Sequence, residues 1–444
     1  MDRQSARNAL RLFNLRESPF FQEPLQLDGH YPLSLFVGRE EDSNTLLKKI
    51  DRSPAGSRQT IRGPVGVGKS TLAQHIKAEV AGDGILSSPG SASLGSASTT
   101  DQLCALILRS ALDALLGVPS LTEKQMQTLV GEPAVQQASQ LVRIYQTTTG
   151  TGGGLGVAGF SASSSHSITL VTPATATPSL VANEVLRELM YVARTRLEAQ
   201  GILIHLNNLE NLTEADATRA AAVLRDIRDI ALTVDGYHWL VVGIDEAVRT
   251  VIDIQPQLKM FNTPPALAPL REEEVLQLLD RRYYALRYDE TQPVHPPIEE
   301  DAVVALYQIF VGDLRGTFAA LDAVMGEILG AGSGGPNAPL TLSDMAPFLT
   351  GWYEERAIAN VGVAVARHIP AMVFTFGLEP FSQTTLKTDV LHLKNNVVTK
   401  RVVDTLLAYG YIAEHQERLH RGGRPAVQYV MTGPARLAAG MARG

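Results

Sequence analysis

The spacing of hydrophobic residues changes along the chain and divides most of it into three regions. Between residues 56 and 265, short apolar runs such as ILIHL alternate with stretches whose apolar residues recur at i, i+3 and i+4. Buried strands that alternate with amphipathic helices predict an α/β domain with a parallel sheet. Residues 266–350 keep only the helical spacing and predict an α-helical domain. Residues 351–444 predict a small helical domain closed by a β-hairpin.

The remaining segments interrupt this pattern. Residues 1–55 form an irregular lead-in whose last part, LFVGREEDSNTLLKKI, predicts a turn into an amphipathic helix. Residues 147–178 are rich in Gly, Ser and Thr, and their centre predicts a flexible β-hairpin inserted into the α/β domain. The GTGGGLG run inside this insertion has no strand before it and no helix after it, which excludes a dinucleotide-binding fingerprint.

Composition places the chain among ordinary globular proteins. Of its 444 residues 45% are hydrophobic and 19% are charged, and no apolar run approaches the roughly 20 residues that span a bilayer. The single cysteine, Cys104, forms no internal disulfide and suits a reducing compartment. The first 15 residues lack an apolar segment of the signal-peptide type. We therefore expect a cytoplasmic protein with no membrane partner.

Charge is distributed unevenly. The formal net charge is −7, yet residues 381–444 hold nine Lys or Arg against four Asp or Glu, a net of +5. A basic end on an acidic body favours a local contact with nucleic acid, while chance imbalance on a solvated surface remains the alternative.

The strongest motif is GPVGVGKST, which matches G-x-x-x-x-G-K-[ST] in full. An apolar strand, QTIRG, precedes it and a helical stretch follows, as a phosphate-binding loop requires. Its backbone N–H groups would surround the phosphates of ATP or ADP, Lys69 would reach the β- and γ-phosphates, and Ser70 would bind Mg²⁺. The predicted nucleotide-binding residues of the loop are Gly63, Pro64, Val65, Gly66, Val67, Gly68, Lys69, Ser70 and Thr71.

A second strand is expected beside the loop's strand, ending in an acidic residue that orients Mg²⁺. The run ILIHL fits that strand, but Asn207 and Asn208 follow it. An amide can bind a metal-bound water but accepts no proton, so this end of the strand predicts slow or absent hydrolysis. Glu210 is the nearest carboxylate and is either a catalytic substitute or a surface residue. The sequence thus leaves a weak ATPase activity open.

Three further motifs, taken with the phosphate-binding loop, resemble the AAA+ ATPases, and most closely the origin-initiator branch related to archaeal and eukaryotic replication initiators. LFVGRE resembles the box that lies against the adenine, WLVVGIDEAV resembles the sensor-1 strand, and VGDLRG resembles the sensor-2 motif of the lid. The resemblance covers about residues 20–330. It implies an α/β AAA+ core, a helical lid at residues 266–350, and assembly with other copies or a partner protein.

The resemblance also assigns residues to roles. It implies that Phe36, Val37 and Gly38 line the base with Arg39 near it, that Asp245 faces the γ-phosphate or water, and that Arg315 lies over the phosphates; Arg249 is the best-placed arginine finger. Arg315 has an alternative role, an ion pair with Asp313 or Asp322. The Asn207–Asn208 pair departs from the family pattern, as does the long separation from Lys69 to Asn207, attributed to the Gly/Ser-rich insertion. Both departures, and the absence of a clear finger, put hydrolysis in doubt and leave nucleotide binding in place.

The last region predicts a winged helix. TLKTDVLHL and NNVVTKRVVDTLLAYGYI suit the two helices of a helix-turn-helix, and two strand-like arms flank RGGRP, the predicted wing. Basic and amide residues at the second helix and the wing suit phosphate and base contacts. The candidate DNA contacts are Lys394, Asn395, Asn396, Lys400, Arg401, Arg418, Arg421 and Arg424. Protein binding is the alternative use of this fold.

Two functions therefore remain open. The first is an ATP-binding AAA+ switch that engages DNA through its winged helix. The second is a nucleotide-gated module that recruits or regulates a protein effector. An ordinary ATPase motor agrees least with the sequence, because Asn207 and Asn208 replace the acidic pair. The sequence does not identify a biological pathway.

Overall fold

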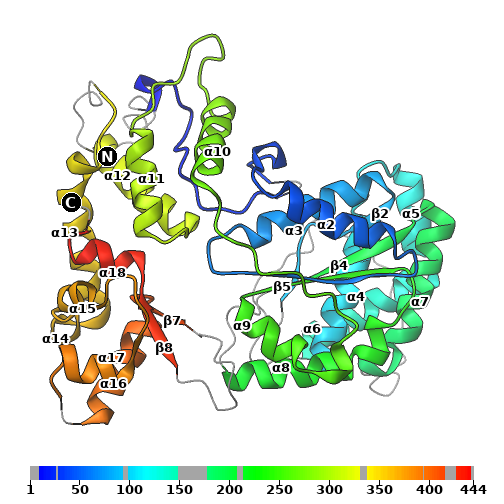
Figure 1. Cartoon of the computed structure of the whole chain (residues 1–444). Helices are drawn as coiled ribbons and strands as arrows, with labels where there is room; N and C mark the ends of the chain where they lie inside the picture. Colours follow the sequence, from blue (N-terminus) through cyan, green and yellow to red (C-terminus); the bar gives the residue numbers. More distant parts are fainter. Residues whose placement is uncertain are drawn as a thin grey trace. The chain divides into compact units, whose positions relative to one another are not determined.

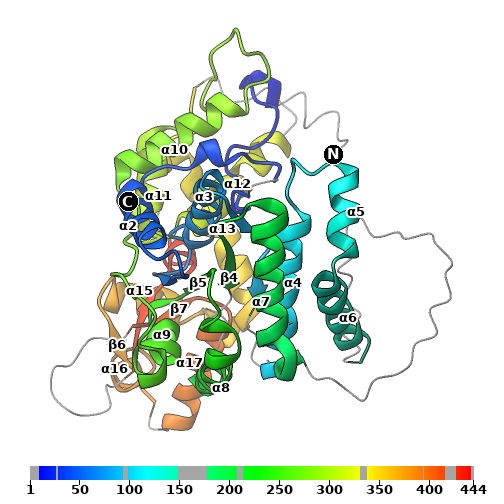
Figure 2. The ribbon, with the colours of Figure 1, turned by 90° about the vertical axis from the view of Figure 1, so that its right-hand side faces the viewer.

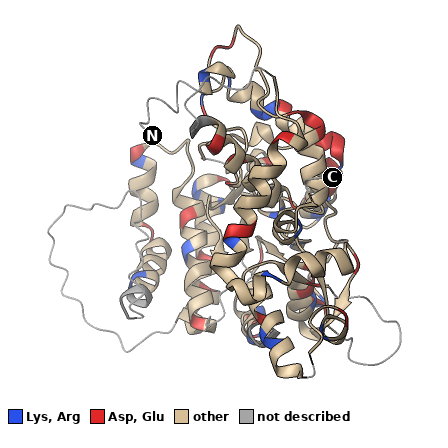
Figure 3. Cartoon of the chain, turned by 90° about the vertical axis from the view of Figure 1, so that its left-hand side faces the viewer, with Lys and Arg blue, Asp and Glu red and all other residues tan. Residues whose placement is uncertain are grey.

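The computed structural model describes residues 10–26, 29–93, 99–148, 178–207, 214–330, 338–393, 395–415 and 427–441. The chain forms two compact units, Pro24–Ala268 and a second made of Met1–Glu23 with Pro269–Gly444. The units thus divide after residue 268, where the hydrophobic pattern placed a boundary after residue 265, and the first residues of the lead-in belong with the C-terminal unit. Lys/Arg and Asp/Glu positions are interspersed over both units (Figure 3).

A five-stranded sheet forms the centre of the Pro24–Ala268 unit, which we call the core unit. Its strands are β1 (Arg58–Arg62), β2 (Ile85–Ser87), β3 (Ala92–Ser93), β4 (Gly201–Asn207) and β5 (Tyr237–Gly243). The order is β1-β5-β4-β2, β3 pairs with β4, and all the pairs are parallel. The α/β class with a parallel sheet is therefore confirmed.

The strand order corrects one expectation. β4, which ends in Asn207, does not pair with β1, because β5 lies between them and pairs with both. All seven residues of β5 are buried, as are the first six of β4, so both strands suit positions inside the sheet. Two strand spacings, roughly 10 Å, therefore separate the ends of β1 and β4.

The outer edge of β1 is covered by residues 262–267. The Asn262 N–H donates to the Arg58 carbonyl at 2.8 Å, and the Leu267 N–H donates to the Arg62 carbonyl at 2.7 Å. Pro264 and Pro265 lie between these bonds, and proline is tolerated here because this segment is at the edge. The covered edge fixes the end of β1, from which the phosphate loop leaves.

Helices cover both faces of the sheet (Figures 1 and 2). The helices of the core unit are η1 (Leu33–Leu35), α2 (Glu40–Asp51), α3 (Lys69–Gly82), α4 (Thr100–Leu116), α5 (Glu123–Gly131), α6 (Pro133–Thr148), α7 (Pro178–Leu197), α8 (Glu214–Asp226), η3 (Arg228–Leu232), α9 (Asp245–Val248), η4 (Arg249–Asp253) and η5 (Pro256–Leu258). α2 and α3 share one apolar core with β1 and one face of β4 and β5. α4, α7 and α8 share a larger core on the opposite face, and α4 and α7 lie side by side (Figure 2).

The long separation between Lys69 and Asn207 has a partly different cause from the one expected. Besides the Gly/Ser-rich insertion, the intervening chain forms α4, α5, α6 and α7. α6 packs against α4 and α7, and its apolar side chains extend the larger core. The predicted hairpin itself, centred within residues 149–177, lies outside the described residues.

The second unit begins with a group of helices. They are α10 (Glu272–Ala285), α11 (Glu300–Ile309), α12 (Leu314–Gly330) and α13 (Leu342–Val361), the last of which runs past residue 350, where the helical domain was expected to end. Arg282 of α10 joins them to the N-terminal segment: its Nη1 donates to the carbonyls of Pro19 at 2.8 Å and Phe21 at 2.9 Å. Its guanidinium also stacks over the Phe21 and Phe318 rings, 3.7 and 4.3 Å from their centroids.

The chain ends in short helices around a small antiparallel sheet. These elements are α14 (Val363–Ala366), α15 (Ile369–Phe376), β6 (Phe381–Ser382), α16 (Gln383–Thr385), η6 (Leu386–Val390), α17 (Asn396–Ala408), β7 (Ile412–His415), β8 (Gln428–Met431) and α18 (Gly433–Ala438). The sheet order is β6-β8-β7, and the two arms pair from Ile412↔Met431 to His415↔Gln428. In the described part of the chain, no helix is long and apolar enough to cross a bilayer.

Candidate nucleotide-binding site

The phosphate-binding motif forms a strand–loop–helix in the core unit. β1 ends at Arg62, residues 63–68 form the loop, and α3 begins at Lys69. Gly66 and Gly68 have φ of 80° and 88°, a left-handed conformation that favours glycine. Gly68 is the N-cap of α3 and supplies no side-chain cap, so the first N–H groups of the helix remain available to an anion.

Lys69 lies inside this loop. Its side chain is 5% exposed, and its Nζ donates to the carbonyls of Gly63 at 3.2 Å and Pro64 at 2.7 Å. The ammonium group therefore lies along the inner side of the loop that its motif predicts to hold phosphate. Ser70 and Thr71 follow in the first turn of α3 and are half-buried.

The segment before α2 packs against the loop and its helix. The Phe36 ring stacks on His75 of α3, with centroids 4.2 Å apart, and Val37 is buried. Burial lowers the pKa of His75, although Glu79 and Glu40 nearby oppose that shift. Gly38 has a φ of 75° and turns the chain into Arg39.

Arg39 is a buried link between segments. Its Nη2 donates to the carbonyl of Val67 in the loop at 3.0 Å and to that of Ala268 at 2.6 Å. Its Nη1 lies 3.5 Å from Asp42 Oδ2. These contacts hold the backbone of the phosphate loop, so Arg39 supports the loop. Its predicted place near the base stays a prediction.

Asn207 closes β4 at the same edge of the sheet as the loop, because the strands are parallel. Its backbone pairs in register with Ser93, and its Oδ1 is buried without a hydrogen-bond partner among the described residues. The amide oxygen of Asn207 is therefore free to accept a hydrogen bond from a water molecule bound to Mg²⁺. In that arrangement Ser70 would bind the metal ion directly. Within the described ranges, no cluster of three His, Cys, Asp or Glu side chains could hold a metal ion. Asn208 and Glu210 lie outside the described residues.

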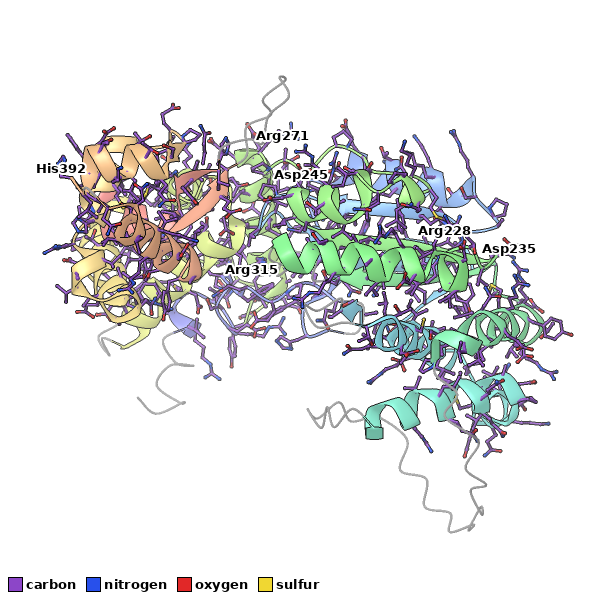
Figure 4. All side chains as sticks on the ribbon, turned by 90° about the horizontal axis from the view of Figure 1, so that it is seen from below. Arg228, Asp235, Asp245, Arg271, Arg315 and His392 are labelled. Carbon is purple, nitrogen blue, oxygen red and sulfur yellow. The ribbon has the colours of Figure 1, made fainter. Side chains whose placement is uncertain are left out.

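Asp245 begins α9, directly after β5. Because β5 is the neighbour of β1, Asp245 lies closer in strand order to the loop than Asn207 does. Asp245 lies at the end of the core unit opposite Asp235 and Arg228, which precede β5 (Figure 4). Arg62 binds it, with Nη1 3.0 Å from Asp245 Oδ1. Arg249 begins η4 and is exposed.

Arg315 belongs to the second unit, in the first turn of α12, where it is exposed. The two aspartates proposed as its alternative partners are engaged elsewhere. Asp313 Oδ1 accepts from the Gly316 N–H at 3.1 Å, and Asp322 Oδ1 accepts from the Ser18 hydroxyl at 2.7 Å. In the described parts of the chain, neither forms an ion pair with Arg315, so the structure does not support that alternative.

Lys77 of α3 is a buried lysine that the sequence analysis did not single out. It is fully buried, and its Nζ donates to the carbonyls of Ser88, Pro89 and Gly90 at 2.8, 3.3 and 2.6 Å. These bonds hold the segment that leads into β3, the strand paired with Asn207. A lysine within the buried stripe of α3, between Ala73 and Val80, was the signal for it.

Burial changes the pKa values of Lys77 and His205. Burial lowers the pKa of Lys77 to about 7. Burial, with Lys77 nearby, holds the pKa of His205 well below its usual range, and neither ring nitrogen of His205 has a partner among the described residues. Lys77 of α3 and His205 of β4 therefore lie close enough to interact, and both pKa values are lowered mainly by burial.

We expect Lys77 to make stability depend on pH. The unfolded chain keeps this proton up to about pH 10.5, whereas the folded chain releases it near pH 7, so unfolding free energy should rise with pH between these values. The three carbonyls favour the charged form and reduce the effect. Between pH 7 and pH 9, the unfolding free energy of the wild type, measured by urea unfolding, should rise by about 1–2 kcal/mol more than that of Lys77→Met. Lys48→Met, at an exposed lysine of α2, should keep the wild-type profile; parallel profiles for the wild type and Lys77→Met would contradict the expectation.

The candidate DNA contacts of α17 are partly engaged within the fold. Asn395 caps the helix, with Oδ1 accepting from the Val397 N–H at 2.8 Å, and Asn396 Oδ1 accepts from Lys387 at 2.9 Å. Lys400 and Arg401 are exposed. Lys394, Arg418, Arg421 and Arg424 lie outside the described residues. Among the described candidates, Lys400 and Arg401 are exposed, and their side chains form no hydrogen bond or ion pair with other described residues.

Comparison with known proteins finds distant structural likenesses. No protein-family model and no curated protein matches the sequence. Among solved structures, the Aeropyrum pernix ORC2 protein (ADPNP–ADP complexes) is similar at 13% identity and a TM-score of 0.43, over 96% of this chain and 98% of that one. The Aeropyrum pernix ORC1 protein in complex with DNA has 12% identity and a TM-score of 0.42, over 92% and 94%. Thermotoga maritima RuvB has 11% identity and a TM-score of 0.38, over 94% and 97%.

Proposed function

We propose that this chain is a nucleotide-binding switch of the AAA+ kind, which holds ATP or ADP with Mg²⁺ at residues 63–71. One observation carries the proposal: an uncapped helix N-terminus follows a glycine loop with a buried lysine inside it. This combination provides backbone donors, a helix dipole and a fixed positive charge for phosphate groups. Lys69 binds the β- and γ-phosphates, and Ser70 ligates the metal ion.

The same site favours slow or absent hydrolysis. Asn207 orients a metal-bound water through its amide oxygen but takes no proton from an attacking water. Asp245 is the polar group facing the γ-phosphate side. Glu210 is the remaining candidate for a general base. In this scheme, nucleotide binding itself sets the state of the switch.

The C-terminal elements support DNA as the partner of the switch. In this proposal, α16, η6 and α17 with the β6-β8-β7 sheet form a winged helix, with α17 as the helix for the major groove. Exposed Lys400 and Arg401 suit phosphates. Exposed Val397 and Val398, at 71% and 46%, suit thymine methyl groups or, in the second candidate function, an apolar protein partner. We place this switch in the cytoplasm, assembled with further copies or a partner protein.

A nucleotide-retention assay tests the proposal. Purified protein is incubated with ATP and Mg²⁺, separated from free nucleotide, and assayed for bound nucleotide and released phosphate. We expect ATP retained in about equimolar amount with negligible phosphate. Steady phosphate release that Glu210→Gln abolishes and Glu123→Gln on α5 does not would instead show that Glu210 is the general base. Absence of any bound nucleotide would refute the proposal.

A further inference from the structure

Arg62 is the last residue of β1 and directly precedes the phosphate loop. Its side chain is 12% exposed and has three partners: Asp245 Oδ1 lies 3.0 Å from Nη1, Asp253 Oδ2 lies 3.2 Å from the same atom, and the Pro264 carbonyl accepts from Nε at 2.8 Å. One guanidinium thus joins the strand before the loop to three segments that follow β5.

The two carboxylates are fixed by different elements. Asp245 begins α9 and Asp253 ends the π-helical turn η4, so α9 and η4 carry both back to the end of β1. The register explains the first contact, because Arg62 pairs with Gly243 and Asp245 follows two residues later. Asp253 Oδ1 is buried without a hydrogen-bond partner among the described residues, which makes Asp253 dependent on Arg62.

Both carboxylates therefore lie at the edge of the sheet from which the phosphate loop leaves. Unpaired, they would repel the phosphates of a bound nucleotide, and the repulsion would be screened less at Asp253, whose side chain is 25% exposed, than at Asp245, whose side chain is 47% exposed. Arg62 neutralises one of the two charges and distributes its own between them. Its Nε bond to the Pro264 carbonyl restricts the direction of the guanidinium, while the positive charge is what offsets the two carboxylates.

We propose that Arg62 is a positioning residue that holds Asp245 and Asp253 in a neutralised arrangement, so that this edge of the sheet accepts the triphosphate of ATP. The proposal rests on the proposed function, because it concerns the same nucleotide. It assigns to Arg62 an indirect role: the arginine acts through the two aspartates. A direct phosphate contact and a purely structural link are the alternatives that the experiment must separate.

The experiment measures dissociation constants for ATP and ADP by calorimetry. Arg62→Gln should weaken ATP binding by on the order of tenfold, the size of one screened charge interaction near a protein surface. ADP should weaken less, because it carries one negative charge fewer. The triple variant Arg62→Gln, Asp245→Asn, Asp253→Asn should recover ATP affinity to within about threefold of wild type, because the repelling charges are gone. The ratio of ATP to ADP affinity is the readout that a purely structural role would leave unchanged.

Each other outcome overturns the proposal. A triple variant as weak as Arg62→Gln indicates a direct phosphate contact, and an unchanged ATP:ADP ratio in Arg62→Gln indicates a structural link. If Arg62→Gln does not fold, Arg62→Lys replaces it: the retained charge should keep ATP affinity within about threefold, and a full tenfold loss overturns the proposal. Wild-type protein that binds no nucleotide refutes the proposed function and this inference with it, whereas binding that depends on Lys69 and not on Arg62 refutes this inference alone.

Discussion

Lys69→Ala is expected to abolish the rise in unfolding temperature that ATP and Mg²⁺ give the wild-type protein. A ligand at about 100 times its dissociation constant stabilises the folded state by about 2.7 kcal/mol, a shift of several degrees that thermal denaturation detects easily. The shift requires that the loop bind phosphate. Alanine removes the charge that binds the β- and γ-phosphates, leaving only the backbone donors.

The measured quantity must be the ATP-dependent shift, because Lys69 also has a structural task. Its Nζ binds the carbonyls of Gly63 and Pro64, so alanine lowers the unfolding temperature even without nucleotide. Lys48→Ala, at an exposed lysine on α2, is the matched control and should retain the full shift. An equal ATP-dependent shift in Lys69→Ala would show that the nucleotide, if bound, is held elsewhere.

The parts of the site that were predictable are those encoded locally. A strand, a glycine loop and a helix start occupy consecutive residues 58–82, so hydrophobic spacing and glycine placement were sufficient to locate the phosphate loop. The α/β class followed from the same spacing. The helices and arms of the C-terminal region also lie where their patterns predicted, because each is set by neighbours in the sequence.

The parts that were not predictable depend on contacts between distant residues. Nothing in ILIHL or WLVVG specifies which strand pairs with β1, since both runs suit a buried strand equally well, and the expected neighbour was therefore wrong. Arg62 acquires its role only when residues 245 and 253 fold back to β1. The partners of Lys77, the carbonyls of residues 88–90, are reached only through the fold, so no local pattern identifies them.

The two asparagines at the start of α17 have structural tasks that the sequence analysis did not assign to them. Their amides were expected to be available for reading bases, whereas the structure uses Asn395 as the helix cap and Asn396 as an acceptor for Lys387. Asn is a preferred N-cap residue, so this use was available from the sequence. DNA recognition by α17 is therefore expected to depend on its cations and its exposed valines.

Reversing the charge of Lys400 and Arg401 together, to glutamate, is expected to weaken binding to duplex DNA by more than about tenfold in fluorescence anisotropy. Each lost phosphate contact also lowers the slope of log affinity against log salt by about 0.9, so the slope should fall by close to two. ATP affinity in the absence of DNA should not change, because neither cation belongs to the proposed nucleotide-binding residues 63–71.

The control for this variant must remove the same charge elsewhere. Lys124→Glu with Arg367→Glu changes two exposed cations outside α17 and should leave the salt slope unaltered. An equal loss in both variants would mean that net charge, and not α17, sets DNA affinity. Unchanged DNA affinity in the α17 variant would exclude this helix as the DNA contact. The exposed Val397 and Val398 would then favour the second function, because an apolar helix face without a nucleic-acid contact suits a protein partner.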